Sequence, residues 1–113
     1  MRTPDDRTYW ILEKRQLEVL RSARRMDISD RLAATGPLSV RELATEIGAP
    51  PATLYHHLSK LIAVGLVVEA GHRVVRRRRE QLYATPAPRM RLIRALAKNQ
   101  FPELLDGIVG DDD

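Results

Sequence analysis

The stretch that most constrains the fold is SVRELATEIGAPPATLYHHLSKL, which occupies residues 39–61. Ser39 followed three residues later by Glu42 forms a capping-box pattern, which predicts the start of a helix. Gly48 stands where that helix needs a left-handed residue to end. Pro50-Pro51 then opens a second helix, because the first turn of a helix tolerates proline. The stretch therefore predicts two short helices joined by a tight turn.

The second of these helices is amphipathic. Its apolar residues recur at i, i+4, i+7 and i+8 and form one stripe of Leu54, Leu58, Leu61 and Ile62. The residues facing the other way are small, aromatic or hydrogen-bonding, with one cation: Ala52, Tyr55, His56, Ser59 and Lys60. Such a face suits entry into the major groove of DNA. We interpret the pair as a helix-turn-helix whose helix over 51–64 contacts DNA.

Tyr55 and His56 are the strongest candidates for base contacts, since they lie one turn into this helix. A phenol or an imidazole donates or accepts hydrogen bonds at base edges, and a ring contacts a thymine methyl group. The alternative is that both are ordinary exposed residues.

A β-hairpin is predicted directly after the helix-turn-helix. Strand-like residues occupy 66–70 and resume at Val74-Val75, and a second run covers 81–85. We expect two antiparallel strands joined by an arginine-rich loop, with residues 71–80 as a wing. Gly71-His72 is either a second turn or a bulge in the first strand.

The net charge of +4 is concentrated after the helix-turn-helix. Residues 71–98 hold nine Lys or Arg residues against Glu80 alone, whereas residues 99–113 hold five acids and no base. A cationic patch of this density predicts contact with phosphates, and one arginine can enter a narrow minor groove. The candidates are Arg76, Arg77, Arg78 and Arg79, with Arg73 as a secondary one. The alternative interpretation is a solvated face or a protected strand edge.

Residues 17–85 resemble the ArsR-like winged helix-turn-helix transcription regulators of bacteria and archaea. The blocks that carry the resemblance are GPLSVRELATEIG (36–48), TLYHHLSKLIAVGLV (53–67) and EQLYATP (80–86). The resemblance implies a mainly α fold with a small β-hairpin, in the order of four helices, two strands and a final helix. It also implies sequence-specific binding of double-stranded DNA as a homodimer, usually at a palindromic operator and usually as a repressor.

The resemblance assigns roles to individual positions. The positions that correspond to base-reading residues are Pro51, Ala52, Tyr55 and His56. Phosphate contacts would come from Thr53, Ser59, Lys60 and the wing, whereas His57 would support the packing of the helix.

Three features depart from the family pattern. Pro50 stands where the family commonly has a serine, so the second helix lacks a side-chain cap worth about 1 kcal/mol. Ser29 and Arg31 replace apolar residues in an earlier helix. The chain has no cysteine, which excludes the thiolate sensing of metals found in one branch of the family.

We expect one domain over residues 1–113, with a core over 17–85 and terminal helices over about 4–16 and 88–105. Residues 16–35 form either one helix or two helices broken near Ser22. The aromatic residues near the N-terminus either pack on the core of their own chain or form a dimer interface. The expected interface residues are Tyr9, Trp10, Leu12, Ile93, Leu96 and Phe101.

Other classes of function find little support. No apolar run is long enough for a membrane span and no signal core is present, so we expect a soluble cytoplasmic protein without a membrane partner. No catalytic constellation occurs, so we expect no enzyme and no cofactor. Adjacent histidines on a helix point about 100° apart, which disfavours a metal site.

The competing hypothesis is a winged-helix module that binds a protein or RNA instead of DNA. No feature identifies an effector.

Overall fold

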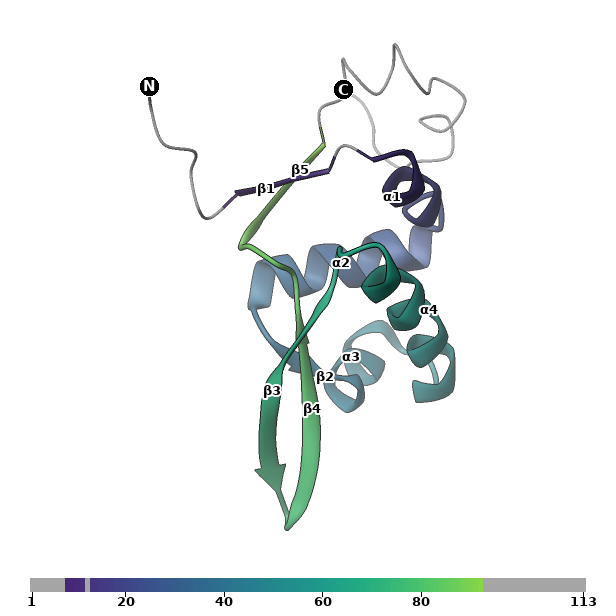
Figure 1. Cartoon of the computed structure of the whole chain (residues 1–113). Coiled ribbons are helices and arrows are strands. Elements are labelled where there is room, and N and C mark those ends of the chain that lie inside the picture. The colour runs from purple at the N-terminus through teal and green to yellow at the C-terminus, as the bar shows by residue number, and fades with distance from the viewer. Residues whose placement is uncertain (1–7, 12, 93–113) are drawn as a thin grey trace, which may run out of the picture.

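The computed structural model describes residues 8–11 and 13–92. A helical body lies at its centre, a long hairpin extends from one end, and two paired strands lie at the other end (Figure 1). The elements in chain order are β1 (Thr8–Ile11), α1 (Lys14–Val19), α2 (Ala23–Thr35), β2 (Leu38–Ser39), α3 (Val40–Ile47), α4 (Pro51–Ala63), β3 (Val68–Val75), β4 (Arg78–Ala84) and β5 (Arg89–Leu92).

The predicted helix-turn-helix is confirmed as α3 and α4. The hydroxyl of Ser39 accepts a hydrogen bond from the Glu42 backbone N–H at 3.2 Å, and the Glu42 carboxylate accepts one from the Ser39 N–H at 3.0 Å. Gly48 ends α3 in the left-handed conformation, with φ +79°. Pro50 precedes α4 without forming a side-chain cap, as its chemistry requires. Local sequence signals therefore specify both helices and the turn between them.

The hydrophobic core is built around α4, which packs against α1, α2 and α3. Leu54, Leu58 and Leu61 are buried on its inner side. The expectation that Ile62 continues this stripe is wrong, because its side chain is 36% exposed. Ile62 lies about 80° around the helix from Leu54, at the margin of the buried face. The rest of the core comes mainly from Leu17, Leu20, Ile28, Leu32, Leu43, Leu66, Val67 and Tyr83.

The hairpin belongs to a three-stranded antiparallel sheet with the order β2-β4-β3. The short strand β2, which the sequence analysis missed, pairs Leu38 with Tyr83 and Ser39 with Leu82. It joins the start of α3 to the base of the hairpin. Gly71 lies in an irregularity of β3 with φ +93°, so of the two interpretations the bulge is correct.

The expectation of terminal helices over 4–16 and 88–105 is wrong for residues 8–11 and 89–92. The segments Thr8–Ile11 and Arg89–Leu92 are strands that pair in parallel, with Tyr9 opposite Met90. Aromatic and β-branched residues such as Tyr9, Trp10 and Ile11 suit a strand, where each segment satisfies the backbone groups of the other. The remaining parts of the two expected helices lie outside the described residues, except for residues 13–16, which include the start of α1.

The segment over 16–35 is two helices rather than one. α1 ends at Val19, and Ser22 caps α2 by accepting a hydrogen bond from the Arg25 N–H at 3.3 Å. No helix in the described part of the chain has the length and apolar character needed to cross a bilayer.

Candidate nucleic-acid interface

The outer face of α4 is open to solvent. Its exposed residues are Pro51, Ala52, Thr53, Tyr55, His56, Ser59 and Lys60. Tyr55 is 56% exposed, whereas its neighbour Leu54 is fully buried, so the helix is anchored by one side and presents the other. All the predicted α4 contacts therefore lie on the accessible side of one rigid element.

His57 is turned away from this face and contacts α2. The Nε of Arg25 donates a hydrogen bond to Nδ1 of His57 at 3.1 Å, which requires this nitrogen to carry no proton. Burial, followed by the charge of Arg25, lowers the pKa of His57 below its usual 6.5. His57 is thus a packing residue, as the sequence resemblance implied.

The wing ends in a two-residue turn made of Arg76 and Arg77. Their φ angles are +50° and +66°, and the flanking residues Val75 and Arg78 are paired across the hairpin. Tight hairpin turns with two positive φ angles usually hold Asn-Gly, because other side chains are strained there. Two arginines in these positions place their guanidinium groups at the extreme end of the hairpin.

The four consecutive arginines are exposed, and none forms an ion pair with another described residue. Arg78 and Arg79 are successive residues of β4, so their side chains point to opposite faces of the hairpin. The wing therefore carries unneutralised positive charge at its tip and on both faces.

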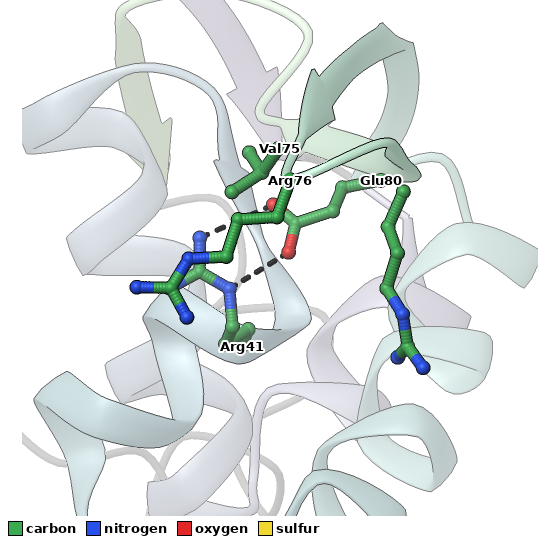
Figure 2. A pocket seen from close by; sticks show the side chains of 5 residues that line it. Arg41, Val75, Arg76 and Glu80 are labelled. Atoms are coloured by element: carbon green, nitrogen blue, oxygen red, sulfur yellow. Dashed lines mark hydrogen bonds and ion pairs between the residues drawn. The ribbon is translucent and has the colours of Figure 1, made fainter.

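Arg73 differs from the other wing arginines because it is already paired. Its guanidinium forms ion pairs with Glu42 of α3 at 2.6 Å and with Glu80 of β4 at 3.4 Å. Glu80 also accepts two hydrogen bonds from Arg41 of α3, at 2.7 and 3.3 Å (Figure 2). The sequence analysis missed this cluster, although Glu80 as the sole acid among nine bases was a visible signal.

The wing and α4 border a common surface. One hollow, beside the ion pair shown in Figure 2, is lined by Arg41, Val75, Arg76, Arg78 and Glu80. A second hollow is lined by Ser39, Val40, Arg41, Tyr55, Arg79, Glu80 and Gln81. Tyr55 and Arg79, predicted from separate segments as base and phosphate contacts, thus lie at the same depression, with Arg41 beside them.

The expected dimer residues fall into three groups. The hydroxyl of Tyr9 accepts a hydrogen bond from Gln16 at 3.0 Å, and Tyr9 packs against the core of its own chain. Gln16 also donates to the Val64 carbonyl at 3.0 Å, which connects β1 to the end of α4. Trp10, in contrast, is 47% exposed. The other four expected residues, Leu12, Ile93, Leu96 and Phe101, lie outside the described residues.

Comparison with known proteins adds a match to a family model and a fold. Residues 20–70 match the family described as "Helix-turn-helix domain". The match spans α2, α3, α4 and the first residues of β3. A solved structure with a similar fold is the transcriptional regulator HlyU from Vibrio vulnificus CMCP6, at a TM-score of 0.52 and 23% sequence identity, over 80% of this chain and 83% of that chain. No curated protein matches the sequence. The architecture of helices and a small antiparallel hairpin sheet is therefore a winged helix-turn-helix.

Proposed function

We propose that this protein is a sequence-specific DNA-binding transcription regulator that inserts α4 into the major groove of an operator. The observation that carries the proposal is the common surface formed by the exposed face of α4 and the unneutralised arginines of the wing. The match to the helix-turn-helix family and the winged fold support DNA binding and transcription regulation.

In this proposal α4 and the wing contact different parts of the DNA. Tyr55 and His56 contact base edges, with Pro51 and Ala52 close to the bases at the start of α4. Thr53, Ser59 and Lys60 contact phosphates beside the groove. Arg76, Arg77, Arg78 and Arg79 contact the backbone, and the tip enters the minor groove. Arg73 contributes through the structure of the wing, because its charge is already neutralised.

We further propose the ArsR-like arrangement, namely a homodimer that acts as a repressor on a palindromic operator in the cytoplasm. The three sequence blocks between residues 36 and 86 support the family assignment. The exposed Trp10 on a terminal strand supports an interface there, because aromatic side chains are enriched in interfaces. A dimer of this kind contacts two half-sites about 34 Å apart, one turn of the duplex.

The test is fluorescence anisotropy with labelled duplexes, including the region upstream of the protein's own gene, at two salt concentrations. We expect selective binding that weakens with salt, and a smaller salt dependence in Arg77→Ala/Arg78→Ala. The control is Lys14→Ala/Arg21→Ala, which removes the same charge at two exposed positions near α1, at the end of the molecule opposite the hairpin tip (Figure 1).

Equal loss of binding in the two double variants would show that only total charge matters and would refute the role of the wing. Absence of any preferred duplex, together with salt-insensitive binding of a protein, would instead support the module that binds protein or RNA.

A further inference from the structure

A connected group of four charged side chains joins the base of the wing to the helix-turn-helix. Arg41 and Glu42 come from the first turn of α3, Arg73 from β3 and Glu80 from β4. Glu80 binds both arginines, and Arg73 extends the connection to Glu42. The capping box holds Glu42 in this group, since the Glu42 carboxylate also accepts a hydrogen bond from the Ser39 N–H. We call this group the wing-base cluster.

A carboxylate on a surface that faces DNA is electrostatically unfavourable for phosphate binding. Glu80 is nevertheless the only acid in residues 71–98. Its side chain is 18% exposed, which shows that its neighbours cover most of it. The hydrogen bond and charge of Arg41 lower the pKa of Glu80 below its usual 4.5, so the group is ionised at neutral pH.

The position of Glu80 explains what the negative charge contributes. Strand β2 pairs with β4 only at Leu82 and Tyr83, so towards the tip the hairpin has no third strand among the described residues. The ion pairs of Glu80 lie directly beyond this point. They connect α3 to the part of the hairpin that carries the tip arginines.

We propose that Glu80 is a positioning residue, which fixes the arginine tip of the wing relative to α4 by binding Arg41 and Arg73. This inference rests on the proposed function. Glu80 contributes to selectivity among duplexes, because a correctly placed tip makes its most favourable contacts on the preferred duplex. It opposes general affinity for DNA, because it cancels part of the positive charge. The two effects have opposite signs in one residue.

The variant Glu80→Gln separates the two effects in the full chain. We expect tighter binding to random duplex, since one negative charge is lost. We also expect the ratio of dissociation constants between random duplex and the preferred duplex to fall on the order of tenfold, the size of coupling found in one ion-pair network. If Glu80 were only a negative charge, binding to both duplexes would tighten equally and the ratio would stay constant.

The matched control is Glu69→Gln on the same hairpin. Glu69 is an exposed residue of β3 that forms no ion pair with another described residue. This variant loses the same charge, and we expect its selectivity ratio to equal that of the unmodified protein. Equal ratios for Glu80→Gln and Glu69→Gln would overturn the proposal.

A second measurement tests the anchoring without DNA. The chain has no cysteine, so nitroxide labels attach only at Thr45→Cys on α3 and Val74→Cys on the wing, both exposed positions. Double electron–electron resonance should show a broader distance distribution in Glu80→Gln and in Arg41→Gln, but not in Glu69→Gln. An unchanged width in Glu80→Gln would refute the anchoring.

The two measurements also distinguish this inference from the proposed function. If the unmodified protein prefers no duplex, the proposed function fails and the effect on selectivity fails with it. The label distances still decide whether Glu80 holds the wing. If the unmodified protein is selective and the distances do not change, only the inference about Glu80 fails.

Discussion

At the scale of single residues, two adjacent histidines of α4 have different environments. His56 is exposed on the outer face, whereas His57 lies partly buried against α2 and accepts a hydrogen bond from Arg25. Their ring centroids are 5.5 Å apart, so their charges would interact. Of these two sequence neighbours, His56 thus lies on the surface proposed to contact DNA, and His57 packs beneath it.

The environment of His57 predicts a dependence of stability on pH. Because the folded pKa lies below the unfolded value of 6.5, the unfolded chain binds the proton more readily. The contribution of neutral His57 to the free energy of unfolding is complete above pH 6.5. It is lost as the pH falls from 6.5 through the folded pKa. Urea unfolding at pH 7.5 and 5.5 should show this loss in the unmodified protein and a smaller one in His57→Gln. The exposed residue His72 provides the control, since His72→Gln should retain the full loss.

The turn at Arg76-Arg77 predicts a conflict between stability and binding. Replacing the pair with Asn-Gly relieves two positive φ angles and should raise the free energy of unfolding by about 1 kcal/mol. The same double variant should bind the preferred duplex more weakly and with a smaller salt dependence. Urea unfolding and anisotropy measure the two effects. A variant that is no more stable would show that the turn is unstrained.

At the scale of elements, the start of α3 organises its surroundings. The capping box begins the helix, β2 pairs the preceding residues with β4, and the first turn supplies Arg41 and Glu42 to the wing-base cluster. In contrast, α4 begins at Pro51 without a side-chain cap and depends on burial of its leucines. The two helices of the motif are therefore stabilised in different ways.

This difference predicts the effect of removing one hydroxyl. Ser39→Ala should lower the free energy of unfolding by about 1 kcal/mol, because the N–H of Glu42 loses the hydroxyl of the buried Ser39 as its acceptor. Thr45→Ala, which removes an exposed hydroxyl bonded within α3, should change stability far less. Chemical denaturation of the two variants makes the comparison, and equal losses would argue against the cap as the cause.

At the scale of the whole molecule, the parallel pair of β1 and β5 lies at the end opposite the wing (Figure 1). Within the described residues neither strand has a second neighbour, and the large side chain of Trp10 is exposed beside them. Two-stranded sheets are marginally stable alone, and open strand edges favour association. This end of the molecule is accordingly the proposed site of dimer contact.

The corresponding prediction concerns molecular mass in solution. The unmodified protein should be a dimer by light scattering at micromolar concentration, and Trp10→Ser should shift it towards the monomer with a matching loss of operator affinity. Val74→Ser is the control, because Val74 is 72% exposed on the wing, away from β1. A monomeric unmodified protein would contradict the dimer, and dissociation of the control would contradict its placement.

Features that depend on neighbouring residues were predictable from the sequence alone. The caps, the left-handed Gly48 and the spacing of Leu54, Leu58 and Leu61 act within a few residues of one another, so the helix-turn-helix follows from local rules. The outer face of α4 follows from the same helical period. The arginines of the wing followed from a run of charge between strand-like segments. These parts comprise most of the candidate interface.

The tertiary structure alone decided the features that join distant segments. The strand at residues 8–11 exists because residues 89–92 pair with it and satisfy its backbone hydrogen-bonding groups. The spacing of residues along the sequence does not indicate such a pairing. Arg73 has the same charge as the tip arginines, but only the fold places it between Glu42 and Glu80. The sequence alone therefore determined the helix-turn-helix and the charge of the surface. The fold decided which charges neutralise one another, because ion pairing depends on distances in space.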